Sequence, residues 1–84
     1  MGYKNDAKRL GHEGSIRVNG DLFHYWVKQY DEKSQYSIDG GRISKLKLMR
    51  DGKITCEYDR GWAVEPEDWN TEMAYETLIR EYNQ

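Results

Sequence analysis

The sequence predicts an α+β fold, in which a four-stranded antiparallel sheet made of two hairpins carries one C-terminal helix on one face. Two stretches of alternating apolar and polar residues each contain a turn dipeptide, Asn19-Gly20 and Asp51-Gly52. The segment after Pro66 changes to a helical spacing of apolar residues. A chain of 84 residues has room for one domain. We expect this ββββα domain at residues 14–84, after a flexible arm at residues 1–13 that shows no periodicity.

The first hairpin is predicted over residues 15–30. Asn-Gly favours a two-residue type I′ turn, because both central residues of that turn need a positive φ. Such a turn pairs Val18 with Asp21 and Ile16 with Phe23. One face of the hairpin is then apolar and points to the core: Ile16, Val18, Phe23, Tyr25 and Val27. The other face carries a mixed set: Arg17, Leu22, His24, Trp26 and Lys28.

The second hairpin, over residues 42–58, allows two turns. A two-residue loop would pair Leu48 with Thr55 and place a core leucine beside a polar side chain. A three-residue loop, residues 50–52, instead pairs Leu48 with Ile54 and puts Gly52 at the left-handed position of a bulge. We expect the three-residue loop. It turns four polar side chains away from the core: Lys45, Lys47, Thr55 and Glu57.

An apolar stripe at helical spacing predicts the C-terminal helix: Tyr75, Leu78, Ile79 and Tyr82. Asn70 or Thr71 is the predicted N-cap. This helix is the element available to cover the apolar face of the sheet. The predicted core combines residues of both: Ile16, Val18, Phe23, Tyr25, Val27, Leu46, Leu48, Ile54, Cys56, Tyr58, Leu78, Ile79 and Tyr82.

The composition narrows the class of protein. Charged residues make up 33% of the chain, but the net charge is only −2, and three Trp, seven Tyr and one Phe supply large areas for burial. No apolar run approaches the ~18 residues of a membrane span, and the N-terminus lacks the apolar stretch of a signal peptide. The single cysteine excludes an internal disulfide. We therefore expect a cytoplasmic protein without membrane contact.

Residues that could carry chemistry are few and scattered. His12, His24 and Cys56 are the candidate metal ligands, but the predicted fold turns Cys56 inward and His24 outward. The same separation excludes a Cys-His nucleophile pair. The acids of residues 65–72 lie where the helix begins, and the helix dipole favours negative charge there. The sequence therefore indicates no metal site, no cofactor and no catalytic residue, and we do not expect an enzyme.

Two motifs stand out in the second half of the chain. They read I-D-G-G-R-I-S-K-L at residues 38–46 and Y-D-R-G-W at residues 58–62, and a Glu-Pro pair and a short acidic helix follow them. With this pattern the chain resembles a family of small uncharacterised bacterial and phage-associated proteins, over residues 15–83. The resemblance implies a cytoplasmic accessory protein of bacteria or their mobile elements. It implies no assigned activity and no catalytic residue.

The sequence favours a small non-enzymatic module that binds an unknown partner protein or a second copy of itself. The candidate surface is the sheet face that the helix leaves open: Trp26, Lys28, Lys45, Lys47 and Arg17. Basic side chains around a ring also suit single-stranded nucleic acid, which is the alternative function. A single ring and an isoelectric point of about 5.6 disfavour it. A competing interpretation covers Trp26 with Leu10 and the arm.

A second candidate surface follows the last predicted strand. Arg60 and Trp62 flank Gly61, and Trp and Arg are enriched at the energetic centres of protein interfaces. The competing interpretation places Trp62 under the helix, because a sheet with few aliphatic side chains needs its tryptophans in the core. We favour the core position for Trp62 and keep Arg60 and Trp62 as the alternative surface.

Overall fold

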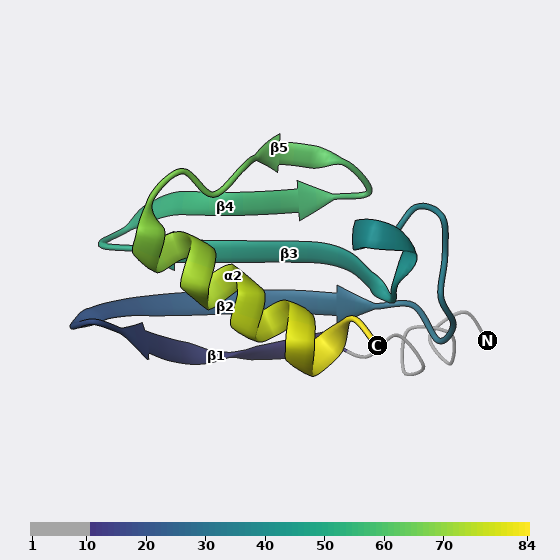
Figure 1. Cartoon of the computed structure of the whole chain (residues 1–84), viewed down its shortest axis with the longest axis horizontal. Helices are drawn as coiled ribbons and strands as arrows, with labels where there is room; N and C mark the ends of the chain where they lie inside the picture. The colour runs from purple at the N-terminus through teal and green to yellow at the C-terminus, as the bar shows by residue number, and fades with distance from the viewer. Residues whose placement is uncertain (1–10) are drawn as a thin grey trace.

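The structure, a computed structural model that describes residues 11–84, is an antiparallel sheet with one helix across it (Figure 1). The elements in chain order are β1 (Gly11–Val18), β2 (Asp21–Gln29), the 3₁₀ turn η1 (Ile38–Gly40), β3 (Ile43–Arg50), β4 (Lys53–Asp59), β5 (Trp62–Val64) and α2 (Trp69–Tyr82). Each strand pairs with the next, in the order β1-β2-β3-β4-β5. The α+β class, the antiparallel sheet and the C-terminal helix are confirmed. The predicted number of strands is wrong, because the sheet has five strands.

The additional strand, β5, is formed by the residues that follow a tight turn. In this turn the Asp59 N–H donates to the carbonyl oxygen of Gly61 at 2.9 Å. Tyr58 then pairs with Trp62, and Glu57 pairs with Val64. A strand of three residues is too short to show a periodicity of two in the sequence. The sequence prediction therefore ended the sheet one strand early.

Strand β1 begins at Gly11, three residues before the predicted start of the domain at residue 14. Gly11 pairs with Lys28, and Gly14 pairs with Tyr25. The Tyr25 ring lies against Gly14, where a Cβ atom would come within 2.8 Å of the phenol oxygen. These two glycines interrupt the alternation of side chains and so conceal the start of the strand. Residues 1–10 of the predicted arm lie outside the described residues.

The first hairpin has the predicted register, with Val18 opposite Asp21. Asn19 and Gly20 have φ values of 49° and 91°, as a two-residue type I′ turn requires. Three side chains of the predicted core face are buried and two are partly buried: Val18, Phe23 and Val27, then Ile16 and Tyr25. The assignment of the two faces of this hairpin is therefore confirmed.

The register predicted for the second hairpin is wrong. Arg50 pairs with Lys53, and the two residues between them have φ values of 53° and 78°. The turn is thus a two-residue loop of the same kind as in the first hairpin. Met49 pairs with Ile54, and beyond this pair the register shifts by one residue. The second hairpin therefore combines a two-residue turn with a bulge, an arrangement that the prediction did not include.

The bulge explains why a two-residue loop does not place Leu48 opposite the polar side chain of Thr55. Thr55 has no partner on β3, so Leu48 faces Cys56 and Leu46 faces Tyr58. Both leucines lie opposite apolar residues and are fully buried. Ile54 precedes the bulge and is 39% exposed, which corrects its predicted place in the core.

The core lies between α2 and the sheet. Eleven hydrophobic residues are buried in it: Val18, Phe23, Val27, Ile38, Ile43, Leu46, Leu48, Cys56, Tyr58, Ala74 and Leu78. Tyr75, Ile79 and Tyr82 of the predicted helical stripe pack around its margin. Ile38 and Ile43 were not predicted for the core, because they belong to a turn-rich segment and the strand start that follows it. They close the end of the core near the C-terminus of α2.

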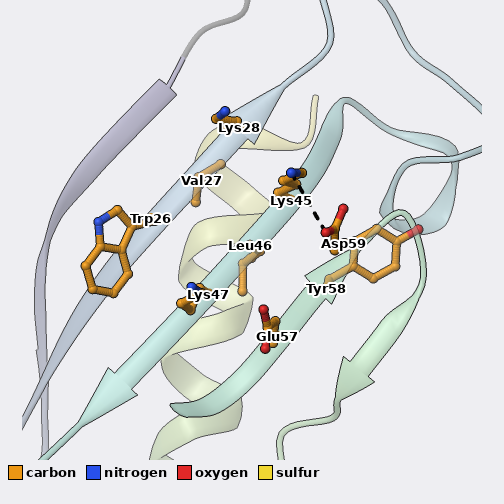
Figure 2. Close-up of a pocket in the computed structure, with 9 residues that line it drawn as sticks. All are labelled: Trp26, Val27, Lys28, Lys45, Leu46, Lys47, Glu57, Tyr58 and Asp59. Atoms are coloured by element: carbon orange, nitrogen blue, oxygen red, sulfur yellow. Dashed lines mark ion pairs between the residues drawn. The ribbon is translucent and has the colours of Figure 1, made fainter. Parts of the chain in front are cut away.

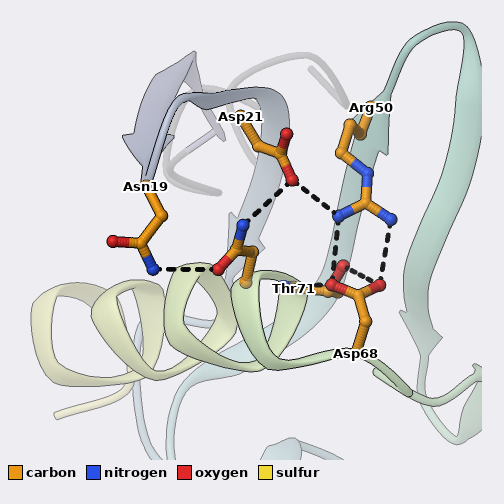
Figure 3. A network of polar contacts seen from close by, with 6 residues as sticks. Asn19, Asp21, Arg50, Asp68 and Thr71 are labelled. Atoms are coloured by element: carbon orange, nitrogen blue, oxygen red, sulfur yellow. Dashed lines mark hydrogen bonds and ion pairs between the residues drawn. The ribbon is translucent and has the colours of Figure 1, made fainter.

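Helix α2 is capped by Asp68, not by Asn70 or Thr71 as predicted. The Asp68 carboxylate accepts hydrogen bonds from the backbone N–H of Thr71 at 2.9 Å and from its hydroxyl at 2.8 Å. Arg50 donates to the same carboxylate through two guanidinium nitrogens, each at 3.0 Å (Figure 3). The hydrogen bonds from Arg50 and from the Thr71 backbone lower the pKa of Asp68 to about 2. The cap therefore also joins the helix to the second hairpin.

The first hairpin is joined to the same network. Arg50 donates to Asp21 at 3.0 Å, and the Asn70 amide donates to the same carboxylate at 3.0 Å (Figure 3). The Asn19 amide donates to the side-chain oxygen of Asn70 at 3.0 Å. The two hairpin ends and the first turn of α2 are thus held together by side-chain hydrogen bonds.

The other end of α2 is held by Asn83. Its side-chain oxygen accepts from the backbone N–H groups of Arg42 and Ile43 at 2.9 and 2.8 Å, and its amide donates to the carbonyl of Ile38 at 2.7 Å. A Cβ atom at Gly41 would overlap Asn83. The second glycine of the I-D-G-G-R motif is therefore required for the contact between the start of β3 and the end of the helix.

Candidate functional site

The sheet face opposite α2 carries an open hollow of about 220 Å³, which we call the Trp26 hollow (Figure 2). Its lining comes from β2, β3 and β4: Trp26, Val27, Lys28, Lys45, Leu46, Lys47, Glu57, Tyr58 and Asp59. Cross-strand pairing explains the arrangement, because Trp26 lies opposite Lys47 and Lys28 lies opposite Lys45. Four of the five predicted site residues therefore lie around one hollow.

Trp26 is partly buried and its ring is held from two sides. The Lys47 ammonium lies 5.7 Å from the ring centroid, and the His24 ring lies 4.2 Å away at a tilt of 51°. A cation over an indole contributes about 0.5–1 kcal/mol at an exposed site. His24 is itself fixed by Glu13, whose carboxylate lies 2.8 Å from the imidazole Nε2. The indole is therefore held in place before any partner binds.

The charges around the Trp26 hollow alternate in sign. Lys47 lies opposite Glu57, and Lys45 lies opposite Asp59 with 3.8 Å between the ammonium and the carboxylate. Lys28 makes no ion pair with any of the residues 11–84. This surface thus offers both donors and acceptors beside a ring, and it is not uniformly basic.

Arg17 does not belong to the Trp26 hollow. It lies near the end of β1, opposite Leu22, and both side chains are exposed. The first hairpin places Arg17 at its turn and Trp26 near its other end, so the shared face does not bring them together. Leu10, the residue that a competing interpretation places over Trp26, lies outside the described residues.

The structure separates Arg60 from Trp62, which the sequence grouped as one alternative surface. Trp62 packs edge-on against Tyr58, with centroids 5.2 Å apart, and lies 5.4 Å from the Tyr75 ring of α2. It nevertheless remains 42% exposed, so it covers the margin of the core. Arg60 instead lines a second hollow together with Lys28 and Lys45.

The sequence prediction missed the most exposed tryptophan of the described residues. Trp69, at the first turn of α2, is 73% exposed, and Met73 one turn later is 42% exposed. With Glu72, Glu76 and Arg80 they line a hollow of about 370 Å³ on the outer side of the helix. The available signal was the position of Trp69 outside the apolar stripe of the helix, since a tryptophan there does not face the core.

The candidate metal ligands and nucleophiles lie apart. Cys56 is fully buried, and burial raises the pKa of its thiol to about 12. His12 lies within hydrogen-bond distance of Gln29, at 2.9 Å, and stacks on Tyr82. Within residues 11–84 no three His, Cys, Asp or Glu side chains are grouped to hold a metal ion. In the same part of the chain no helix is long and apolar enough to cross a membrane.

Residues 11–83 match the model of a family described as a domain of unknown function (DUF7678). No curated protein and no solved structure matches the chain.

Proposed function

The chain belongs to the DUF7678 family, and from this premise we propose that it is a small non-enzymatic binding module that contacts a partner protein through the Trp26 hollow. The match spans β1 to the end of α2, so it includes every strand that lines the hollow. We further propose, from the resemblance carried by residues 38–46 and 58–62, that the protein is a cytoplasmic accessory protein of bacteria or their mobile elements.

The pre-positioned ring of Trp26 is the observation that supports protein binding. An aromatic side chain that is already ordered loses little conformational entropy when a partner covers it. Tryptophan is among the residues that contribute most to protein interfaces. Lys47 and His24 hold the ring, and the hollow beside it is large enough to receive a side chain of the partner.

The charge pattern favours a protein over single-stranded nucleic acid. A nucleic-acid strand presents a continuous row of phosphates, and proteins that grip it align cations along the backbone and several rings for the bases. Here Glu57 and Asp59 lie opposite Lys47 and Lys45. Of the two aromatic residues in the lining, Trp26 and Tyr58, Tyr58 is buried in the core, which leaves one ring for stacking. Alternating charges of this kind suit the mixed donors and acceptors of a polypeptide.

A co-purification experiment with matched tryptophan variants tests the proposal. The tagged full chain, Trp26→Ala and Trp69→Ala would be used to capture proteins from a bacterial lysate, after circular dichroism shows that all three fold. We expect the wild type and Trp69→Ala to retain the same partner proteins, and we expect Trp26→Ala to lose them. Loss with Trp69→Ala alone would place the interface on the outer side of α2 and contradict the proposal.

A titration with single-stranded DNA tests the alternative. Binding through phosphates weakens steeply between about 50 and 200 mM salt. We expect no measurable binding at the lower concentration. Tight binding at low salt that is lost at high salt, and that Lys47→Glu abolishes, would make the nucleic-acid function the better explanation.

A further inference from the structure

A second hollow of about 250 Å³, which we call the Arg60 hollow, adjoins the Trp26 hollow at the end of the sheet. Three cationic side chains and two hydroxyl-bearing residues line it: Lys28, Tyr30, Ser44, Lys45 and Arg60. The two hollows share Lys28 and Lys45. The chain therefore gathers the cations of β2, β3 and the β4–β5 turn at one place.

Backbone contacts hold this cluster together. The Arg60 N–H donates to the carbonyl oxygen of Ser44 at 3.0 Å, which fixes the turn beside the start of β3. The Ser44 hydroxyl donates to the carbonyl oxygen of Lys28 at 3.2 Å, which ties β3 to β2. The positions of the cations thus follow from the sheet and its last turn.

Two features of the cluster disfavour the folded state when nothing is bound. Lys28 and Lys45 lie directly opposite each other on neighbouring strands, and like charges in such a pair repel. Arg60 has a φ of 57°, a conformation that residues with a Cβ atom adopt at a cost. Such local costs are concentrated at sites that bind ligands.

The charges in the Arg60 hollow do not balance. Among residues 11–84, Asp59 is the carboxylate that forms ion pairs with these cations, 3.8 Å from the Lys45 ammonium and 3.6 Å from the guanidinium Nε of Arg60. Three positive charges and one negative charge leave a local excess of two. An anion with two negative charges would neutralise this local excess of positive charge.

We propose that the Arg60 hollow binds the phosphate monoester of a phosphorylated side chain on the partner protein. A phosphate monoester carries a charge of about −1.5 to −2 near neutral pH and has three acceptor oxygens. The guanidinium fork of Arg60 and the ammonium groups of Lys28 and Lys45 match those acceptors. A carboxylate or a phosphodiester has one negative charge and would leave the excess half neutralised.

This inference rests on the proposed function, because the phosphorylated segment is taken to continue from the Arg60 hollow into the Trp26 hollow. Lys28 and Lys45 lie in both hollows, so one extended segment can place a phosphate beside Arg60 and a neighbouring side chain beside Trp26. Recognition would then combine a charge-assisted contact with an aromatic one.

A nuclear magnetic resonance titration of the full chain with phenyl phosphate tests the site. At constant ionic strength, we expect saturable shifts of the amide signals of the residues that line the Arg60 hollow. Dimethyl phosphate, a diester, should bind at least tenfold more weakly. Lys53→Gln is the matched control, because it removes an exposed lysine at the opposite end of β4 and should leave the affinity unchanged.

Arg60→Gly separates binding from folding. Glycine adopts a positive φ without strain, so this variant should be at least as stable as the wild type in urea. It should nevertheless bind phenyl phosphate at least tenfold more weakly, since the guanidinium is absent. Equal binding by the wild type and Arg60→Gly, or shifts that never saturate, would overturn the proposal.

Three further outcomes identify which proposal fails. Equal affinity for the monoester and the diester, or tighter binding of single-stranded DNA, would assign the site to nucleic-acid phosphates and overturn the inference. If phenyl phosphate does not bind but Trp26→Ala still loses its protein partners, the Arg60 site is refuted and the proposed function stands. If phenyl phosphate binds as expected but Trp26→Ala keeps every partner, the phosphate site stands and the proposed function is refuted.

Discussion

Replacing Asp68 by Asn should destabilise the protein by about 1 kcal/mol at neutral pH and make that loss depend on pH. The pKa of Asp68 is lowered from 3.8 to about 2, chiefly by the hydrogen bonds from Arg50. Each pKa unit corresponds to about 1.4 kcal/mol, so the full effect would be about 2.4 kcal/mol. The Asp68 side chain is 44% exposed, and solvent screening reduces this to about 1 kcal/mol.

The direction of the pH dependence follows from the lowered pKa. A carboxyl group that is more acidic in the folded state stabilises the fold above its unfolded pKa, near 3.8, and loses this contribution as the pH falls through about 2. Asn is as good an N-cap as Asp, so Asp68→Asn removes the charge and retains the cap. The wild type and the variant should therefore differ at pH 7, and the difference should shrink below about pH 4 and disappear only below about pH 2.

Urea unfolding at a series of pH values measures this difference. Glu67→Gln is the control, because it removes a neighbouring exposed carboxylate that makes no ion pair within residues 11–84. Its stability should follow that of the wild type. A gap between wild type and Asp68→Asn that stays constant with pH, or no gap at pH 7, would show that the ion pair with Arg50 does not stabilise the helix start.

Three other substitutions test the packing. Leu48→Ala should cost about 2–5 kcal/mol in urea unfolding, whereas Ile54→Ala should cost well under half of that, because Leu48 is fully buried and Ile54 is 39% exposed. Equal losses of stability would contradict the two-residue turn with its bulge, and they would support the three-residue loop with Ile54 in the core. Gly41→Ala should lower the midpoint of thermal unfolding by several degrees, because a Cβ atom overlaps Asn83, and an unchanged midpoint would mean that the C-terminus of α2 is not held there.

The sequence alone determined the features that depend on residues close together in the chain. Asn19-Gly20 dictates a two-residue turn through its own backbone preferences, and the alternation on either side then sets the register. The helix is likewise visible as a stripe of apolar residues at its own period. For the same reason the open face around Trp26 and Lys28 could be predicted, since alternation assigns each residue of a strand to one face.

Contacts between residues that are far apart in the chain determined the register of the second hairpin, the cap of the helix and the last strand. The bulge at Thr55 depends on which residues Leu46 and Leu48 meet in the packed core. The N-cap at Asp68 is held by Arg50 of the second hairpin. The additional strand exists because a turn returns the chain to the edge of β4.

That same turn brings Arg60 to Lys28 and Lys45, while Trp62 packs toward α2. Sequence spacing groups Arg60 with Trp62 because the two are close in the chain. Side chains two residues apart around a turn can nevertheless point to opposite sides of the sheet, and only the folded backbone determines which side each one occupies.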